Sequence, residues 1–433
     1  MRLTVFGMGY LGLTHAVCMA ELGHEVLGVE VDQAKIAKLA DGEVPFYEPG
    51  LADLLKKHLD SGLLRITTSY QDAADWGDLY FIAVGTPQKK GESAADLRYV
   101  EAVIDGLAPL VRNDVLILGK STVPVGTCAK LVDRARALST GADIEIAWNP
   151  EFLREGYAVQ DTVAPDRIVL GRIEGGRAEA LTREVYAPIL ARDTPFIITD
   201  PETAELVKVS ANAFLATKIS FINAIAEVCD AVGADVTAVA DAIGYDARIG
   251  RRFLNAGLGF GGGCLPKDIR AFMARAGELG ASEALTFLRE VDNVNMRRRT
   301  RMVEVTRIAC NGSLLGANVA ILGAAFKPDS DDVRDSPALN VAGQLQLQGA
   351  SVTVYDPKAI ENSRKVFPTL SYASSVRDAC EKADVVLVLT EWAEFTEINP
   401  AELSAIVRRT TVIDGRLCLD RERWTKSGWR YLT

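Results

Sequence analysis

Short apolar-rich runs recur through the first third of the chain, each followed by a polar or glycine-containing turn. They lack the strict alternation of a half-exposed strand, and such runs are typical of strands buried on both faces of a parallel sheet. The runs are residues 2–6, 24–29, 79–84, 115–118 and 144–147. Their spacing predicts intervening helices and a doubly wound α/β sheet.

A second series of apolar runs predicts a second doubly wound unit near the carboxyl end. The runs are residues 319–323, 352–356, 384–390 and 411–414. Ala-Ala-Phe-Lys follows Gly323, so this unit lacks the glycine pattern of a dinucleotide site and should hold something other than a second whole dinucleotide. Lys327, Arg334 and Arg416 fall at strand-end loops, where they could receive phosphates or the far edge of a cofactor.

The segment 201–232 carries a long helical pattern between these two series. Apolar residues recur every three or four positions from Leu206 to Ala231, after a capping Asp200 and before Gly233. At 1.5 Å per residue the helix is roughly 45–50 Å long, more than one domain usually needs. We expect it to span between domains or to pair with a second subunit.

The expected fold is therefore α/β, with two Rossmann-like doubly wound domains joined by a long central helix. The chain of 433 residues is long enough for two or three domains. We expect Rossmann-like domains at residues 1–199 and 311–433, with a central helical domain at residues 200–310.

The first strand leads into Gly7-Met8-Gly9-Tyr10-Leu11-Gly12, and Glu30 ends the second strand. Glycines in this pattern between two strands, with an acid after the second, form a strong dinucleotide fingerprint. The pyrophosphate sits on the helix N-terminus, and the acid binds the ribose hydroxyls. A carboxylate repels a 2′-phosphate, so we predict NAD rather than NADP. Asp32 either shares this role or caps the next helix.

Composition and charge exclude several classes of protein. With 48% hydrophobic residues the chain can bury large cores, but no apolar run approaches the ~18 residues of a membrane helix. The first residues run directly into a strand rather than a secretory signal, and seven scattered cysteines without a Cys-x-x-Cys pair fit a reducing cytoplasm. His15, His24 and His58 lack metal-ligand spacing, so we expect no metal.

The net charge of −10 disfavours nucleic acid as the main partner. The one dense basic run is Arg297-Arg298-Arg299 with Arg301, in a helix-like segment. We interpret it as a solvated helix face rather than a phosphate-binding tract.

The candidate chemistry centres on the glycine-rich stretch Gly259–Asp268, which contains Cys264, Lys267 and Asp268. A thiol beside a lysine can be held as the nucleophilic thiolate. The alternative is a flexible loop with a small buried residue. Lys208 and Asn212 lie one turn apart on the predicted long helix, as a functional pair or as surface residues.

Several further stretches carry a resemblance to a known family. They are Gly7–Gly12, Tyr47–Leu51, Ser121–Pro124, Asn149–Leu153, Lys208 with Asn212, Arg248–Gly250, the Cys264 loop, and Phe326-Lys327 with Arg334. Together they resemble the UDP-glucose/GDP-mannose dehydrogenase family along nearly the whole chain. This resemblance identifies Cys264 as the nucleophile.

The resemblance implies oxidation of the C6 alcohol of a nucleotide sugar to a carboxylate, with two NAD+ reduced. Lys208 with Asn212, through water and Asp268, would serve as the base for the first hydride loss, and Cys264 would carry a thiohemiacetal and then a thioester. Glu151 is the candidate base for hydrolysis, with Thr122 placing the water. The division of base duty among Lys208, Asp268 and Glu151 stays open.

The same resemblance implies the residues that bind each ligand. Those expected to meet NAD are Gly7, Gly9, Leu11, Gly12, Glu30, Lys35, Thr86, Thr122, Glu155, Lys267 and Arg334. Those expected to line the sugar-nucleotide site are Glu151, Phe152, Leu153, Arg154, Glu155, Lys208, Asn212, Arg248, Phe253, Leu254, Asn255, Gly257, Gly261 and Lys327. Arg248 is expected to reach the site of a partner subunit in a homodimer built on the central helix. From the residues alone, Thr86 and Thr122 are equally open to ordinary turn roles.

Two positions depart from the family's usual pattern. Glu30 stands where the family usually has Asp, and Gly263 replaces a Ser next to the nucleophile. The first leaves the geometry of ribose recognition open, and the second removes a hydroxyl beside Cys264.

Three alternatives compete with oxidation of UDP-glucose to UDP-glucuronate. The first is GDP-mannose or a UDP-N-acetylhexosamine as substrate, although residues 246–250 and 253–255 are more similar to the UDP-glucose branch. The second is a two-electron hydroxyacid dehydrogenase, which shares the Lys-x-x-x-Asn pair but needs no cysteine. The third is a non-catalytic NAD-binding sensor, which the intact set of Cys264, Lys208, Asn212 and Glu151 disfavours.

Overall fold

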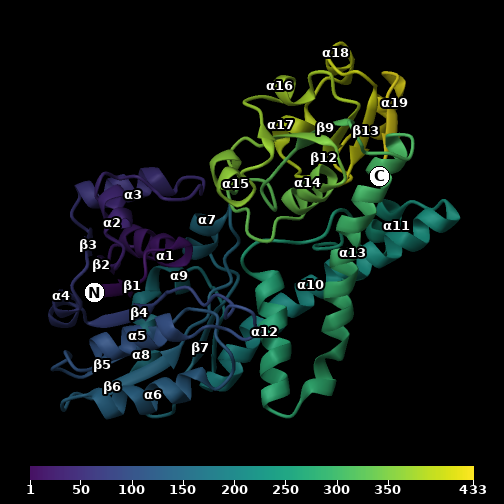
Figure 1. Ribbon diagram of the computed structural model, residues 1–433. Helices are drawn as coiled ribbons and strands as arrows, with labels where there is room; N and C mark the ends of the chain where they lie inside the picture. Colours follow the sequence, from purple (N-terminus) through teal and green to yellow (C-terminus); the bar gives the residue numbers. More distant parts are fainter. The chain divides into compact units, whose positions relative to one another are not determined.

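The computed structural model describes all 433 residues and divides into two compact units (Figure 1). The first unit comprises Met1–Ala211 and Arg270–Gly280, and the second comprises Asn212–Ile269 and Ala281–Thr433. Two parallel sheets and a long helix confirm the expected fold class.

The first unit is built on an eight-stranded sheet with the order β3-β2-β1-β4-β5-β6-β7-β8. Neighbouring strands are parallel except β6 and β7, which are antiparallel. Its strands are β1 (Arg2–Phe6), β2 (Glu25–Val29), β3 (Leu64–Thr67), β4 (Leu79–Ile82), β5 (Val115–Gly119), β6 (Ile144–Trp148), β7 (Ile168–Gly171) and β8 (Phe196–Thr199). Strand β1 pairs with both β2 and β4, so the order reverses there, and ligands of such sheets bind at this reversal.

Helices cover both faces of this sheet, and each face has its own hydrophobic core. Along β4, Leu79 and Phe81 enter one core while Tyr80 and Ile82 enter the other, because successive strand residues point to opposite faces. The helices of this unit are α1 (Tyr10–Glu21), α2 (Gln33–Ala40), α3 (Leu51–Asp60), α4 (Tyr70–Trp76), α5 (Arg98–Leu107), α6 (Thr127–Leu138), α7 (Ala158–Val163), α8 (Ala178–Val185) and α9 (Ala187–Leu190). Helices α1 and α3 pack on one face and α5 and α6 on the other (Figure 1).

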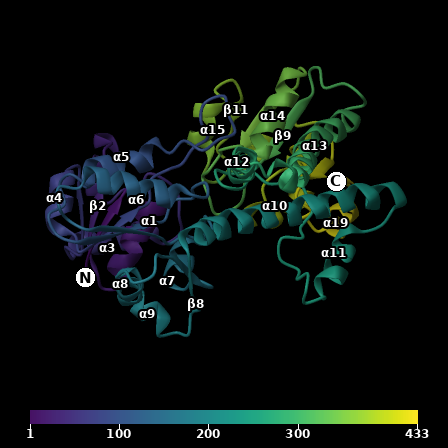
Figure 2. The same cartoon turned by 90° about the horizontal axis from the view of Figure 1, so that it is seen from below.

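Helix α10 (Pro201–Val232) has the predicted bounds and runs unbroken from the first unit into the second (Figure 2). Asp200 caps it by accepting a hydrogen bond from the Thr203 amide at 2.7 Å. By length and composition the helix could cross a membrane, with a mean hydropathy of 1.3 over 18 residues. However, 44% of that window is buried within the protein, and Lys208, Asn212 and Asn223 are buried polar residues on the same helix, as in a core helix.

The second unit holds a six-stranded, fully parallel sheet with the order β11-β10-β9-β12-β13-β14. Its strands are β9 (Asn318–Leu322), β10 (Ser351–Tyr355), β11 (Ser371–Tyr372), β12 (Val385–Val388), β13 (Thr411–Asp414) and β14 (Arg430–Leu432). Its other elements are α11 (Val236–Gly244), the start of α12 (Leu265–Glu278), the 3-10 helix Ser282–Leu285, α13 (Thr286–Ala309), α14 (Pro337–Leu347), α15 (Ile360–Val366), α16 (Val376–Cys380), α17 (Ala393–Thr396), α18 (Pro400–Ser404) and α19 (Arg421–Lys426). Strands β3, β7, β8, β11 and β14 were not expected from the apolar runs. Strands β3, β11 and β14 lie at sheet edges and mix polar with apolar residues, whereas β7 and β8 are largely apolar runs of four residues that were overlooked in the sequence.

The basic run on α13 corrects one expectation. Arg297 and Arg301 are exposed and pair with acids on α10, but Arg298 is 8% exposed and Arg299 only 2%. Arg298 donates to the Gly257 carbonyl at 2.9 Å, and Arg299 forms an ion pair with Asp335 at 2.8 Å. Half of the run is therefore buried structure, because guanidinium groups can satisfy carbonyls that no other donor reaches.

Candidate active site

The turn after β1 has the geometry of a dinucleotide cradle. Gly7 has a φ of 91°, which favours glycine, and a Cβ atom on Gly12 would collide with the Gly7 carbonyl. A Cβ atom on Gly9 would meet nothing within 4 Å, so the space in front of Gly9 is open for a ligand. Helix α1 begins at Tyr10, directly after this turn, and offers its N-terminal amides to a phosphate.

Glu30 lies at the end of β2, beside this turn. Its carboxylate accepts hydrogen bonds from the Met8 amide at 3.2 Å and from Lys35 Nζ at 2.7 Å. Burial raises the pKa of Glu30, but Lys35 and two backbone amides outweigh burial, and the net pKa is lowered. Asp32 caps α2 by accepting from the amides of residues 34 and 35, which is one of the two roles expected for it.

Two strand-end turns of the first unit are joined by side-chain hydrogen bonds. The Thr86 hydroxyl donates to the Thr122 carbonyl at 2.7 Å, and the Ser121 hydroxyl donates to the Val84 carbonyl at 2.7 Å. Both threonines therefore lie at the carboxyl edge of the sheet, where ligands of this fold bind.

Glu151 and Lys208 form a buried ion pair in the first unit. The Lys208 ammonium lies 3.1 Å from Glu151 Oε1, and the two side chains are 7% and 14% exposed. The other Glu151 oxygen accepts from the Leu153 amide at 2.7 Å, and the Phe152 ring lies 5.5 Å from the ammonium. A carboxylate and an amine held this way can exchange protons with a bound substrate.

Asn212 and Asp268 meet in the second unit. The Asn212 amide donates to Asp268 Oδ2 at 2.6 Å, and Lys267 donates to Asp268 Oδ1 at 2.5 Å. Both Asn212 and Asp268 are buried, at 7% and 2% exposed. The surface alternative for the Lys208 and Asn212 pair is therefore wrong.

Cys264 directly precedes the first residue of α12, and its thiol is exposed. Its carbonyl accepts from the Asp268 amide at 2.9 Å, which closes the first turn of that helix. The positive end of a helix dipole favours an anionic sulfur at this position. The alternative of a buried structural cysteine is wrong.

The glycine at position 263 has a physical reason in this chain. A Cβ atom there would collide with the guanidinium of Arg334, which is also paired with Asp332. The Gly262 amide donates to the Arg334 carbonyl at 2.9 Å, and Gly262 has a φ of 83°. The glycine loop thus lies tightly against the Arg334 loop, and no serine fits at position 263 without moving Arg334.

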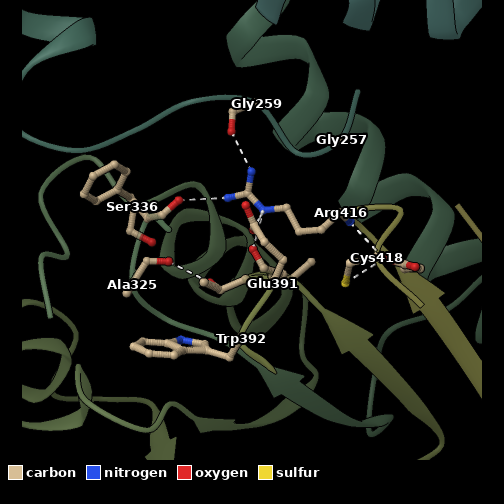
Figure 3. A network of polar contacts seen from close by, with 12 residues as sticks. Gly257, Gly259, Ala325, Ser336, Glu391, Trp392, Arg416 and Cys418 are labelled. Carbon is tan, nitrogen blue, oxygen red and sulfur yellow. Dashed lines mark hydrogen bonds and ion pairs between the residues drawn. The ribbon is translucent and has the colours of Figure 1, made fainter. Parts of the chain in front are cut away.

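Arg416 ties three loops of the second unit together (Figure 3). Its guanidinium donates to the carbonyls of Gly259 at 2.9 Å, Phe326 at 3.0 Å and Leu389 at 2.8 Å, and it lies 3.3 Å from a Glu391 oxygen. The expectation that Arg416 receives phosphates is corrected, because these carbonyls already hold its guanidinium against the glycine loop.

The remaining predicted residues are spread over loops of the two units. Arg154 pairs with Asp161 at 2.7 Å, and Arg248 is exposed and pairs with Asp246 at 2.5 Å. Leu254 and Glu155 are buried. Between residues 253 and 257, Phe253 has a φ of 65°, the Asn255 side chain accepts from Arg251 at 2.7 Å, and the Gly257 amide donates to Asn223 at 2.8 Å. A Cβ atom on Gly261 would collide with the Asp335 carbonyl. The Lys327 ammonium lies 5.5 Å from the centre of the Phe326 ring.

Two buried charged groups were not found from the sequence. Lys120 lies at the end of β5, and Glu205 lies one turn before Lys208 on α10. Glu205 is 1% exposed and accepts from the amides of Gly126 and Cys128, at the start of α6. The sequence offered two signals for them: Lys120 directly precedes Ser121, and Glu205 is an acid within the apolar pattern of the long helix.

The fold and these side chains define a class of protein: an NAD-linked dehydrogenase with a Rossmann-like cofactor sheet, a buried acid and lysine, and an exposed cysteine at the start of a helix. Matches to family models agree over most of the chain. The NAD-binding domain of the UDP-glucose/GDP-mannose dehydrogenase family matches residues 1–190, the central domain matches residues 202–297, and the UDP-binding domain matches residues 320–421.

Individual relatives extend over the full length. A UDP-glucose 6-dehydrogenase of Rhizobium meliloti is 41% identical over 100% of this chain and 98% of its own. A UDP-glucose dehydrogenase structure from Pyrobaculum islandicum has a TM-score of 0.91 and 37% identity, covering 100% and 97% of the two chains. The GDP-mannose dehydrogenase structure from Pseudomonas aeruginosa has a TM-score of 0.55 and 30% identity, covering 97% and 98%. The chain belongs to the UDP-glucose/GDP-mannose dehydrogenase family, and its cofactor is NAD.

Proposed function

We propose that this protein oxidises UDP-glucose to UDP-glucuronate, with two NAD+ reduced for each sugar. The observation that carries the chemistry is Cys264, exposed at the start of α12. The sugar is supported by the full-length similarity to UDP-glucose 6-dehydrogenases and by the higher TM-score of a UDP-glucose dehydrogenase than of a GDP-mannose dehydrogenase.

The residues of the chain divide the reaction into four steps. NAD, when bound at the Gly7–Gly12 turn, accepts a hydride in each of the two oxidations. A base removes the proton of the C6 hydroxyl as the first hydride leaves, and Lys208, acting with Asn212 and Asp268, is the proposed group. The Cys264 thiolate adds to the aldehyde, and Lys208 stabilises the oxyanion of the resulting thiohemiacetal.

Loss of the second hydride from this thiohemiacetal leaves a thioester on Cys264. Glu151 then takes a proton from water, which attacks the thioester carbon, and the sulfur leaves as thiolate. Thr122 helps to place that water. The products are one uronate and two NADH, and the thiolate is regenerated.

Mutation of Cys264 and Glu151 tests this sequence of steps. Cys264→Ser should lose overall turnover by several powers of ten, because an unactivated hydroxyl is a far poorer nucleophile. Glu151→Gln should slow only hydrolysis, so intact-protein mass spectrometry should detect a uronyl adduct on Cys264. If Cys264→Ala still produced two NADH per sugar at a steady rate, sulfur would not be the covalent carrier.

The choice of sugar is tested separately. UDP-glucose, GDP-mannose, UDP-N-acetylglucosamine and UDP-N-acetylmannosamine are each offered with NAD, and kcat/KM is compared. UDP-glucose should give the highest value. Preference for another sugar would move the assignment within the family and leave the mechanism in place, whereas a single NADH per sugar would favour a two-electron dehydrogenase.

We also propose a homodimer built on α10. Four apolar side chains of this helix are exposed. They lie seven or four positions apart, so they share one face of the helix. They are Phe214, Phe221, Val228 and Val232, at 66%, 51%, 60% and 73% exposed. Arg248, exposed and charged, is proposed to reach the partner's site. Light scattering should give twice the chain mass of 46.7 kDa, and a monomer at micromolar concentration would contradict both proposals.

The division into domains at residues 1–199, 200–310 and 311–433 stays part of this proposal. The first would bind NAD, the second would carry the catalytic loop and the dimer contact, and the third would bind the UDP-sugar. The proposed location is the cytoplasm, with no metal, membrane or nucleic acid involved. The three matched family segments support the order of these parts.

A further inference from the structure

Lys120 is a charged side chain in the interior of the first unit. It follows β5, is 7% exposed, and donates to Asn149 Oδ1 at 2.9 Å and to the Tyr186 hydroxyl at 3.1 Å. The rings of Phe81 and Tyr186 lie 5.8 and 5.6 Å from its ammonium. Removing an ammonium group from water has a large desolvation penalty. A position with this cost calls for a reason beyond packing.

The fold around Lys120 does not depend on its ammonium. The Tyr186 hydroxyl donates to Asn149 Oδ1 at 2.8 Å, so that oxygen keeps a partner without the lysine. The Asn149 side-chain amide donates to the Val169 carbonyl at 2.7 Å, and its backbone amide donates to the Gly119 carbonyl at 2.8 Å. Removing the charge would therefore leave no buried acceptor unsatisfied.

The ammonium is connected to the proposed reaction centre of this unit through Asn149. Asn149, which it contacts, precedes Glu151 by two residues, and Glu151 pairs with Lys208 at 3.1 Å. Burial lowers the pKa of Lys120 to about 8, the charge of Glu151 raises it and that of Lys208 lowers it further. His15 of α1 has its pKa held well below its usual value by burial and by the charge of Lys120, and is neutral. Tyr186 is neutral as well, since burial raises its pKa.

We propose that Lys120 is a positioning residue for the dehydrogenase reaction: its buried ammonium, acting through Asn149 and by its charge on the Glu151–Lys208 pair, holds that pair in its working arrangement. It touches no substrate. Its positive charge attracts the Glu151 carboxylate and repels a positive charge on Lys208, the same two interactions that act on Lys120 itself. This inference rests on the proposed function, since it assigns Glu151 and Lys208 their roles.

The test compares the wild type with Lys120→Met, which keeps the length of the side chain and removes its charge. We expect kcat to fall about 10- to 100-fold, as for loss of support to a general base, with KM for UDP-glucose within about threefold. The acidic limb of the pH–kcat profile should move to higher pH by about 0.5, because a neighbouring positive charge is lost. The melting temperature should be equal or higher, because a buried charge is replaced by an apolar group.

Tyr186→Phe is the matched control, because it removes the other hydrogen bond to Asn149 Oδ1 and keeps the ammonium. It should leave the pH profile unchanged. If Lys120→Met had the wild-type kcat and pH profile, or did not fold, or lost activity only in step with its melting temperature and with Tyr186→Phe, the inference would be wrong. Failure of the wild type to oxidise UDP-glucose would instead overturn the proposed function.

Discussion

The two sheets share the same strand order, but the acids and loops that follow corresponding strands differ. Strands β3-β2-β1-β4-β5-β6 of the first sheet correspond in order to β11-β10-β9-β12-β13-β14 of the second, and the first sheet adds β7 and β8. In both, a glycine with positive φ follows the first strand, Gly7 at 91° and Gly323 at 106°. In both, an acid ends or follows the second strand, Glu30 in one and Asp356 in the other.

The two acids differ in what remains available to a ligand. Asp356 is 2% exposed and accepts from the amides of residues 324, 325, 358 and 359 and from the Trp392 indole, all fixed donors of the fold. Glu30 is 7% exposed and accepts from the amides of residues 8, 31 and 32, but its fourth partner is Lys35, whose side chain is 29% exposed and can move. The acid of the second sheet is thus held only by fixed donors, whereas that of the first also has one partner that can move.

The connections after the first strand differ as well. In the first unit, α1 begins at Tyr10, three residues after Gly7, and its amides face the turn. In the second, residues 324–336 separate Gly323 from the start of α14, and this loop carries Lys327 and Arg334. A helix N-terminus at the turn suits a pyrophosphate, whereas a longer loop with basic side chains suits a different phosphate arrangement. The same sheet therefore supports two kinds of site.

The sheets also bury different titratable groups. The first unit buries Lys120, with a pKa lowered to about 8 by burial, and Glu205, with a pKa raised to about 7 by burial. In the second sheet the largest shifts fall on tyrosines and cysteines, such as Tyr372 and Cys380, whose pKa values rise to about 12 by burial. Those groups stay neutral at physiological pH, so changes between pH 5 and 8 should act mainly on the first unit.

The largest predicted effect is the loss of stability that follows removal of the Asp356 carboxylate. Asp356→Ala removes the acceptor of five buried donors, so we expect a loss of about 4 kcal/mol in the free energy of unfolding. Urea denaturation followed by tryptophan fluorescence measures it, since Trp392 contacts this carboxylate. Glu30→Ala is the matched variant, with a smaller loss of about 2 kcal/mol, because Lys35 is partly exposed and can bind water instead. Equal losses for the two variants would show that the acids are equivalent.

The next effect concerns Glu205. Its pKa is higher folded than unfolded, so its contribution to stability is fully present below about 4.5 and is lost as pH rises through about 7. The contribution amounts to about 3 kcal/mol at most. We expect the unfolding free energy of the wild type to fall relative to that of Glu205→Gln as the pH rises through this window. Denaturation at several pH values measures both. A difference independent of pH would contradict the assignment.

A smaller effect is expected on NAD affinity when the glycine turn is changed without disturbing its fold. Gly9→Ala has room for its Cβ atom, so the protein should fold normally, while a bound pyrophosphate would meet the new methyl group. We expect NAD affinity, measured by calorimetry, to fall about 30-fold, or about 2 kcal/mol. Gly277→Ala on α12 also has open space and should leave NAD affinity unchanged. Unchanged affinity in Gly9→Ala would place the cofactor elsewhere.

The smallest effect concerns cofactor choice. Glu30→Gln removes the charge that faces a 2′-phosphate, so the ratio of kcat/KM for NAD over NADP should fall about tenfold, or about 1.4 kcal/mol. Asp32→Asn should change stability through the cap of α2 and leave this ratio alone. Initial rates with both cofactors at equal concentration decide the matter. Equal use of NADP by the wild type would remove Glu30 from cofactor selection.

Apolar runs predicted the central strands and α10 well, because burial on both faces leaves a continuous signal in the sequence. Edge strands such as β11 gave no such signal. Lys120, Glu205 and Arg299 were missed or misread, because the type of a charged residue says nothing about its burial. Their partners come from distant parts of the chain, as with Tyr186 for Lys120 and Asp335 for Arg299, and only the fold brings these together.

The distribution of the seven cysteines has a practical consequence. Cys264 is the exposed thiol, while Cys18, Cys128, Cys229 and Cys380 are buried and the other two are half-buried. Burial raises the pKa of the thiols of Cys18, Cys128, Cys310, Cys380 and Cys418, which keeps them protonated. A mild alkylating or disulfide reagent should therefore modify one sulfur per native chain. Counting that reaction, with and without a nucleotide sugar in solution, would measure the concentration of competent enzyme in any preparation without a turnover assay.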